Sequence, residues 1–275
     1  MESGSVPSDA ASSTPPPCMN ALAAETPTMV LSHALRLRSL RALTPYIPEA
    51  WECQLCASGL ISRYPSIPDG LRHGFAVGIS NPACSFTPPN NPSVSVHADV
   101  FKEIVDKELS KGRYLDPADK ESLESILGPI QTTPLSLVPK PGKPGKFRLI
   151  QNLSYPYKPS ELHTSVNSRV DPDLFPAHYS TFHIISLLIS RLPPGSEAAV
   201  RDVAEAYRTV PSHPLQWPSL VVRLSDNEFA VDTSLCFGFA PSGGVYGMIG
   251  KAGADIMRYT GIGPIARWVD DHIFF

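Results

Sequence analysis

The feature that most constrains the fold is a pair of adjacent acids inside an apolar segment. Asp270 and Asp271 follow the residues IARWV at 265–269 and are followed, after one histidine, by IFF at 273–275. Apolar runs rich in β-branched and aromatic residues are typical of strands, so this segment is expected to form a strand or hairpin with the acids at its turn. Two carboxylates that lose hydration side by side need a compensating cation. Taken alone, the pair would be interpreted as a solvated Asp-Asp turn.

Composition sets broad limits. A chain of 275 residues can hold one large domain or two small ones, and its formal net charge of −3 argues mildly against a nucleic-acid protein. No run of about 18 apolar residues predicts a membrane span, and no basic-then-apolar leader is visible, which favours an intracellular protein, cytoplasmic or nuclear, over a secreted one. The five cysteines, which lack a disulfide-framework spacing and suit a reducing compartment, are Cys18, Cys53, Cys56, Cys84 and Cys236. Cys53 and Cys56 have no second pair or nearby histidine, which argues against zinc.

The first part of the chain differs in composition from the rest. Residues 1–29 are rich in Ser, Pro and Ala and are expected to be a disordered tail. Residues 30–44 have apolar positions at helical spacing and predict a short amphipathic helix. Residues 45–96 carry many Pro, Gly and Asn residues and are expected to be mostly irregular. Residues 30–96 together are therefore interpreted as an N-terminal extension.

From residue 97 onward the pattern alternates between helices and short strands. Apolar spacing and turn residues predict helices over 97–112, 117–127 (capped by Asp116), 181–191 and 243–259. The predicted strands are 135–138 and 147–150 around a Pro-Gly-Lys loop, the hairpin 220–224 and 228–232, and a buried strand over 198–203 that carries Asp202.

Four of these pieces carry chemically informative residues in a fixed order. They are a basic hairpin (Lys140, Lys143, Lys146, Arg148), Asp202 with Tyr207 five residues on, the turn Leu235–Gly238 before a helix, and the pair Asp270-Asp271. Two-metal phosphoryl transfer needs carboxylates from separate strands, cations for a triphosphate, and a glycine where the backbone approaches its substrate. Singly, each piece has a bland explanation as a strand cap, a solvated loop or core packing; the ordered combination favours function.

This ordered set resembles the reverse transcriptases. Their K-x-R, D-x4-aromatic, L-x-F/Q-G and x-x-D-D patterns are matched by Lys146–Arg148, Asp202–Tyr207, Leu235–Gly238 and Trp268–Asp271. Residues 111–113, 152–154 and 165–167 are most similar to the enzymes of retrotransposons that use a tyrosine recombinase, the DIRS-like group. The resemblance implies an α+β fold over 97–275, with right-hand fingers and palm subdomains, a small antiparallel sheet and no thumb.

The resemblance also implies roles. The catalytic and metal-facing carboxylates would be Asp202, Asp270 and Asp271, with the Val203 carbonyl completing the shell of Mg²⁺ or Mn²⁺. The nucleotide would be bound by Lys146, Arg148, Tyr207, Phe237 and Gly238, with Tyr207 excluding a 2′-hydroxyl. The implied reaction is RNA-directed DNA synthesis as part of a retrotransposon polyprotein. Its partners would be an RNA template, a DNA primer and deoxynucleoside triphosphates, with no membrane.

Departures from the pattern leave two alternatives open. Trp268 stands where Tyr is usual, Asn152 where many members have Asp, and Cys236 where Pro is common. The family pattern continues with the hairpin's return strand, a primer grip and a thumb, none of which is expected here, so a catalytically inactive remnant is one alternative. The other is an RNA-dependent RNA polymerase palm, although Tyr207 and Val269 favour deoxynucleotides.

Overall fold

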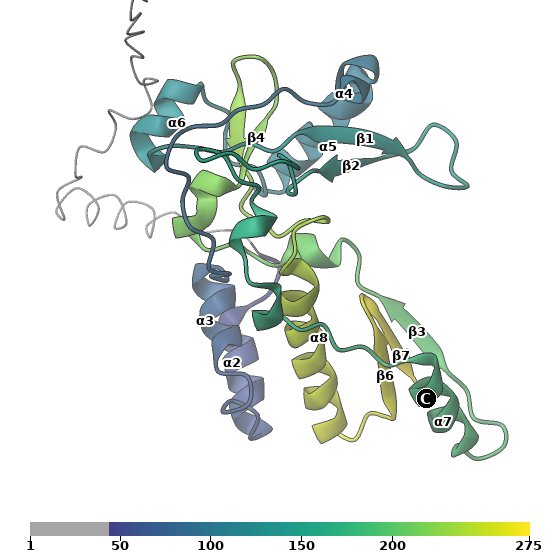
Figure 1. Cartoon of the computed structure of the whole chain (residues 1–275). Coiled ribbons are helices and arrows are strands. Elements are labelled where there is room, and N and C mark those ends of the chain that lie inside the picture. Colours follow the sequence, from purple (N-terminus) through teal and green to yellow (C-terminus); the bar gives the residue numbers. More distant parts are fainter. Residues whose placement is uncertain (1–43) are drawn as a thin grey trace, which may run out of the picture.

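The computed structural model describes residues 44–275. The predicted tail over 1–29, and all but the last residue of the helix predicted for 30–44, lie outside the described residues. Helices and three small antiparallel sheets make up the described chain, which confirms the α+β class. Figure 1 shows two lobes, an upper one with β1, β2 and β4 and a lower one with α2, α3, α8 and the sheet of β3, β7 and β6. Within residues 44–275, no helix combines the length and apolarity needed to cross a membrane.

The upper lobe is built around two hairpins. Its elements are α4 (Pro92–Val96), α5 (Ala98–Ser110), α6 (Lys120–Leu127), β1 (Leu135–Pro139), β2 (Phe147–Gln151), β4 (Val221–Arg223) and β5 (Phe229–Val231). β1 and β2 pair antiparallel with Leu135 opposite Gln151, and the Pro-Gly-Lys loop joins them as predicted. Apolar side chains from α5, both hairpins and the neighbouring loops form a small core: Val94, Phe101, Val105, Tyr114, Leu135, Leu137, Val222 and Ala230.

The lower lobe surrounds one long helix. Its regular elements are α2 (Pro48–Ala57), α3 (Ser66–His73), α7 (Phe182–Ser190), β3 (Ala199–Asp202), α8 (Ser242–Tyr259), β6 (Ile265–Trp268) and β7 (Asp271–Phe274). Four 3-10 turns accompany them: η2 (Asn167–Arg169), η3 (Pro172–Leu174), η4 (Ala206–Thr209) and η5 (Pro214–Ser219). α8 buries Val245, Tyr246, Ile249 and Ala252 in the main core, where small residues let neighbouring chain segments approach closely.

Three expectations about these elements had different outcomes. Residues 45–96 are mostly irregular, as expected, but they also contain the helices α2, α3 and α4; Pro48 and Pro92 occupy the first turns of α2 and α4, where a proline fits a helix rather than breaking it. α6 is capped by Asp119, whose side chain accepts a hydrogen bond of 2.7 Å from the Ser122 amide, and not by Asp116. β7 is the return strand of the terminal hairpin; it agrees with the hairpin expected from the apolar residues and corrects the expectation, taken from the family resemblance, that the return strand is missing.

The burial of β3 also differs from the expectation. All four of its residues are exposed, including Val200 at 62%, although the sequence predicts a buried strand. β3 lies at the edge of its sheet, paired with β7 on one side only. No residue of α7 is buried either, and Phe182 is 86% exposed. Apolar composition predicted these elements correctly, but within residues 44–275 no layer covers them.

Candidate active site

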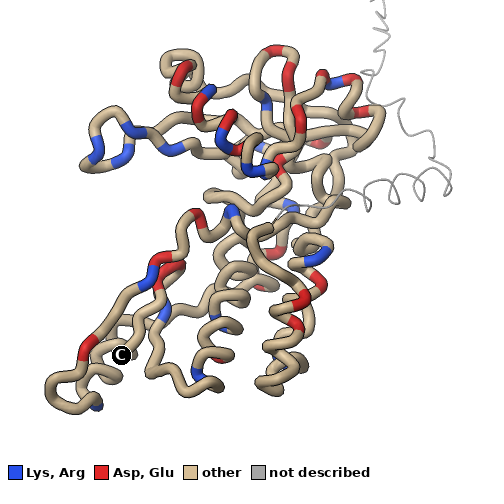
Figure 2. The backbone as a smooth tube through the Cα atoms, turned by 180° about the vertical axis from the view of Figure 1, so that it is seen from behind, with Lys and Arg blue, Asp and Glu red and all other residues tan. Residues whose placement is uncertain are grey.

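Strand pairing brings the three predicted catalytic acids to one end of the lower sheet. Asp202, the last residue of β3, stands directly opposite Asp271, the first residue of β7. The next residue, Val203, donates its amide hydrogen to the Asp270 carbonyl over 3.0 Å. Figure 2 shows acidic positions gathered at this end of the sheet. Segments separated by almost seventy residues in the sequence thus meet where both carry carboxylates, as the sequence analysis expected.

The turn between β6 and β7 has an unusual backbone. It consists of Val269 and Asp270, and Val269 has a φ of 49°. A positive φ is rare for any residue with a Cβ and rarest for a β-branched one. The left-handed conformation costs about 1–2 kcal/mol in such a residue. The tight turn fixes Asp270 and Asp271 as a unit, because neither can shift without moving the other.

The three acids are not ion-paired in the described chain. Asp202 is exposed, Asp270 and Asp271 are half-buried, and none of the three forms an ion pair with any residue in 44–275. Carboxylate oxygens are hard donors of the kind that Mg²⁺ and Mn²⁺ accept. Within the described part of the chain, however, no group of three or more His, Cys, Asp or Glu side chains is already arranged to hold a metal ion. The donor chemistry therefore fits a divalent cation, while the side chains are not preassembled as a ligand cluster.

Aromatic rings adjoin the acids. The Tyr207 ring lies 4.8 Å from that of Phe237, at 54°, and 5.9 Å from that of Tyr246. Burial, reinforced by the neighbouring Tyr179 and by the charge of Asp270, raises the pKa of Tyr207 to about 12. Tyr207 therefore stays neutral at ordinary pH. Phe237 is 56% exposed, so its ring offers an open apolar surface beside the acidic end of the sheet.

The predicted glycine turn joins the two lobes. Gly238 has a φ of 91°, and a Cβ at this position would lie 2.9 Å from the carbonyl oxygen of Gln151, the last residue of β2. The Asn167 side chain holds the turn from the other side: its Nδ2 donates to the Gly238 carbonyl over 2.8 Å, and its Oδ1 accepts from the Ala240 amide over 2.9 Å. Only glycine combines this conformation with this approach.

The two predicted triphosphate-binding cations are not brought to the acids. Lys146 and Arg148 are exposed on the β1–β2 hairpin of the upper lobe, and neither forms an ion pair with a described carboxylate. The Lys146 carbonyl accepts from the Lys140 amide over 2.8 Å and closes the loop. Figure 2 shows several Lys and Arg positions along this hairpin, apart from the acidic end of the lower sheet.

Glu205 is a notable residue of the site that the sequence analysis did not single out. It has a φ of 56° and lies in the turn between Asp202 and η4. Lys107 and Lys111 contact its carboxylate at 2.5 Å each, and Arg113 at 2.8 Å. Burial alone would raise the pKa of Glu205, but the hydrogen bonds from these three cations outweigh it and hold the pKa well below its usual range. Glu205 thereby ties the turn after Asp202 to α5 and to the loop after it.

The same cations continue into a buried ionic chain. Arg113 also lies 3.5 Å from Glu108, which contacts Arg208 at 2.8 Å, and Arg208 pairs with Asp232 at 2.8 Å. Burial favours the neutral form of Asp232 and raises its pKa, with Arg208 opposing that shift. The chain runs from the strand end of β5 through α5 to the segment that follows Asp202. No local sequence pattern predicts it, because members in contact with each other lie up to a hundred residues apart in the sequence.

Comparison with known proteins gives matches among solved structures only. No protein-family model matches the chain, and no curated protein matches it. The native prototype foamy virus protease-reverse transcriptase matches over 89% of this chain and 29% of its own, with 17% identity and a TM-score of 0.48. A foamy viral protease-reverse transcriptase, dRH form, in complex with double-stranded DNA matches over 90% of this chain and 38% of its own, with 17% identity and a TM-score of 0.47. The chain thus spans well under half of these two proteins.

Proposed function

We propose that the chain belongs to a reverse transcriptase and carries its nucleotidyl-transfer site. The single observation behind the proposal is the register of the lower sheet, in which Asp202 faces Asp271 and the Val203 amide bonds to Asp270. Three carboxylates that converge without an ion pair to any described residue fit the two-metal clamp of nucleotidyl transfer. The partners would be an RNA template, a DNA primer and deoxynucleoside triphosphates.

Each residue would have a distinct task. Asp202, Asp270 and Asp271, with the Val203 carbonyl, would hold two Mg²⁺ or Mn²⁺ ions, which lower the pKa of a primer 3′-hydroxyl and stabilise the departing pyrophosphate. Tyr207, kept neutral, would lie under the sugar and exclude a 2′-hydroxyl. The exposed ring of Phe237 and the Cβ-free surface of Gly238 would line the base pair.

The remaining roles belong to the upper lobe. Lys146 and Arg148 would bind the triphosphate, since Arg and Lys side chains are the usual partners of phosphate oxygens. In the described conformation they stand on a separate lobe from the acids. Glu205 would be a positioning residue that keeps the turn after Asp202 in place through α5. The proposal also assigns the reverse transcriptase to the DIRS-like group of retrotransposons, and this assignment rests on the sequence motifs alone.

The test is primer extension by the 275-residue chain on oligo(dT) annealed to poly(rA), with labelled dTTP or UTP and Mg²⁺ or Mn²⁺. The wild-type chain should incorporate dTTP. Asp202→Asn and Asp270→Asn should each reduce the rate by at least about two orders of magnitude, since losing a metal ligand removes several kcal/mol of transition-state stabilisation. Asp226→Asn, an exposed acid in the β4–β5 turn, is the matched control and should keep the wild-type rate.

Other outcomes would replace the proposal. Preference for UTP would indicate an RNA-dependent RNA polymerase. Binding of the primer–template without incorporation of either nucleotide, under conditions where circular dichroism shows a folded chain, would indicate a non-enzymatic remnant. Wild-type rates in both acid variants would rule out the metal-facing role of the carboxylates.

A further inference from the structure

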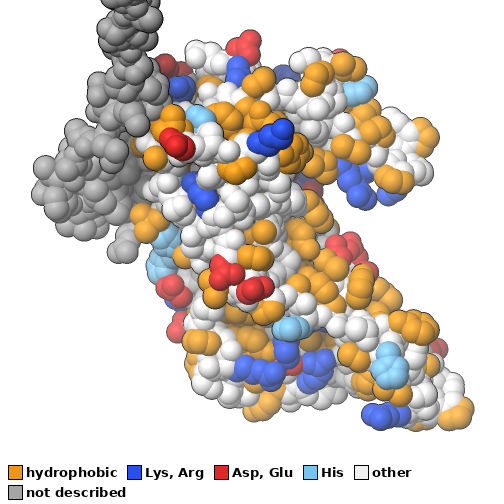
Figure 3. Space-filling view, viewed as in Figure 1, with side chains coloured by type: hydrophobic (Ala, Val, Ile, Leu, Met, Phe, Trp, Pro, Cys, Tyr) orange, Lys and Arg blue, Asp and Glu red, His pale blue; other side chains and the backbone are white. Residues whose placement is uncertain are grey.

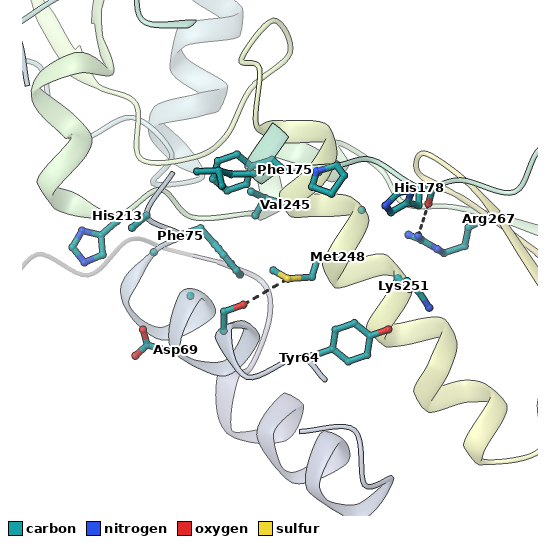
Figure 4. A pocket seen from close by; sticks show the side chains of 18 residues that line it. Tyr64, Asp69, Phe75, Phe175, His178, His213, Val245, Met248, Lys251 and Arg267 are labelled. Atoms are coloured by element: carbon teal, nitrogen blue, oxygen red, sulfur yellow. Dashed lines mark hydrogen bonds between the residues drawn. The ribbon is translucent and has the colours of Figure 1, made fainter. Parts of the chain in front are cut away.

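A pocket of about 650 Å³ lies in the lower lobe, between α3, the loop that includes Leu174–Pro176, and α8. Its walls are mainly apolar, and Figure 4 shows Phe75, Phe175, Val245 and Met248 around it. This volume is within the range of small-molecule sites, which combine apolar walls with a few polar groups that orient the ligand. No residue of this pocket takes part in the site proposed above.

The polar group at one end of the pocket is Arg267, from β6. The residue is only 6% exposed. Its Nη2 donates to the His178 carbonyl over 3.2 Å, drawn as a dashed line in Figure 4, whereas its buried Nη1 has no hydrogen-bond partner in the described chain. A Cβ on Gly250 would lie 2.5 Å from Nη1, so a glycine on α8 makes room for the guanidinium. Nη1 is sealed from solvent beside Gly250, which does not line the pocket, so the pocket meets other atoms of the Arg267 side chain.

Two other arginines with little exposed side-chain surface have counter-ions, and Arg267 has none within the described chain. Arg113 pairs with Glu205, and Arg208 pairs with Glu108 and Asp232. Arg267 forms no ion pair with any residue of the described range 44–275. Removing an arginine from water without a nearby negative charge is strongly unfavourable. The arrangement therefore favours an anionic ligand at this end of the pocket.

The surroundings of Arg267 add further positive charge. Asp255 on α8 is shared by three cations, Arg258 at 2.7 Å, Lys251 at 3.0 Å and Arg63 at 3.4 Å, and also accepts a hydrogen bond from Tyr64. One carboxylate therefore faces several basic groups at this end of α8. Figure 3 shows Lys and Arg side chains gathered on the lower part of this face. The acid at the opposite end, Asp69, is paired with His73 at 2.8 Å.

We propose that the pocket binds a small amphiphilic anion, with a carboxylate or phosphate group on an apolar body. The acidic group would pair with the guanidinium of Arg267 where it borders the pocket, and the apolar part would lie against Phe75, Val245 and Met248. The site is independent of nucleotidyl transfer, because none of its residues belongs to the acidic end of the sheet. It would exist even if the chain had no polymerase activity.

The test is isothermal titration calorimetry on the 275-residue chain with four probes: decanoate, decyl phosphate, decan-1-ol and inorganic phosphate. Decanoate or decyl phosphate should bind with one-to-one stoichiometry, and comparison of the two identifies the preferred acidic group. Decan-1-ol should bind about ten- to a hundredfold more weakly, the loss expected for one charge-assisted hydrogen bond, and inorganic phosphate should show no comparable affinity. Arg267→Gln should weaken the binding of decanoate by a similar factor.

Two further variants separate binding from folding. Met248→Trp should fill the pocket and abolish binding of every probe, while Lys102→Gln on α5, an exposed and ion-paired lysine outside the pocket, should leave all affinities unchanged. Circular dichroism checks that each variant is folded. If Arg267→Gln does not fold, the preference of the wild-type chain for decanoate over decan-1-ol decides the matter. Equal affinity for those two probes, wild-type affinity in a folded Arg267→Gln, or no binding of either anion would overturn the proposal.

Discussion

At the scale of single residues, Gly238 shows how one backbone conformation can join distant parts of the chain. Its positive φ turns the segment before α8, and its missing Cβ lets the carbonyl of Gln151 approach. Asn167 then fixes the turn with two hydrogen bonds. The contact links the end of the β1–β2 hairpin to the surface next to Tyr207 and Phe237.

Replacing Gly238 with alanine should therefore be costly. Gly238→Ala adds strain of about 1–2 kcal/mol from the left-handed backbone and forces Gln151 to move. Gly145→Ala, in the loop of the β1–β2 hairpin, is the matched control, because its φ of 71° carries the same kind of strain with nothing within 4 Å of the added Cβ. Urea unfolding should show a clearly larger loss for Gly238→Ala. Equal losses would mean that the approach of Gln151 contributes nothing.

Sequence patterns located some of these residues and not others. Asp202 and Asp270-Asp271 could be predicted because each sits at the end of a recognisable apolar strand, and strand ends that pair meet at one edge. Glu205 could not, because the partners that make it notable lie near residue 110 and its left-handed conformation leaves no trace in composition. Arg267 could not be predicted either, because the sequence shows it only as one polar position in an apolar strand and does not show what surrounds it.

At the scale of elements, the ionic chain fastens α5 to the segment after β3. Its outer member, Glu205, is held ionised by Lys107, Lys111 and Arg113. A carboxyl group whose pKa is lower in the folded than in the unfolded state stabilises the fold above its unfolded pKa, and that contribution disappears as the pH falls through the folded pKa. The contribution of Glu205 should therefore be complete above its ordinary pKa of 4.5 and decline below it.

The Glu205→Gln variant tests this dependence. It should be less stable than the wild-type chain at neutral pH, and the difference should shrink progressively as the pH falls below 4.5. Chemical denaturation at a series of pH values measures the difference. Glu103→Gln, at an exposed position of α5, should differ little from wild type at any pH. A constant gap between Glu205→Gln and wild type across the acid range would refute the assignment.

Element types were predicted better than element surroundings. α5, α7, α8 and the hairpins β1–β2 and β4–β5 follow from apolar spacing and turn residues, and the structure confirms them. The helices inside the mostly irregular region 45–96 were not predicted, because Pro48 and Pro92, which begin two of them, were taken as signs of irregular structure. β3 was judged buried from its apolar residues, but burial depends on which layer covers a strand, and that is decided elsewhere in the chain.

At the scale of the whole molecule, charge is distributed unevenly. The formal net charge is −3, yet the β1–β2 hairpin presents Lys140, Lys143 and Lys146 on one loop. A local basic loop can bind a phosphate backbone even when the sum of charges is negative. The mild acidity of the chain is therefore compatible with nucleic-acid binding through the upper lobe.

Neutralising this loop should change how binding depends on salt. Each phosphate contact contributes a slope of about 0.9 to the fall of log affinity with log salt concentration for a duplex. Converting Lys140, Lys143 and Lys146 to Gln should reduce the slope for an RNA/DNA hybrid by up to about 2–3, as measured by fluorescence anisotropy at several salt concentrations. A charge-matched control, in which the ion-paired residues Arg72, Lys102 and Lys120 become Gln, should keep the slope. An unchanged slope in the loop variant would exclude the hairpin from the interface.

The arrangement of the two lobes was beyond the reach of sequence patterns. Motif spacing grouped Lys146 and Arg148 with the acids, but spacing along a chain does not fix the distance between subdomains. That distance depends on packing between residues such as Gly238 and Gln151, whose contact no local pattern reveals. The pocket beside Arg267 likewise arises only when α3, α8 and β6 come together.

The backbone of Val269 has one more consequence. Glycine would adopt a φ of 49° without a steric penalty, so selection for folding alone would favour glycine between the two strands of the terminal hairpin. Val269, with its branched side chain, occupies the position instead. The turn that carries Asp270 therefore holds a steric cost that does not serve the stability of the hairpin, and the proposed metal-facing role of the turn would account for it.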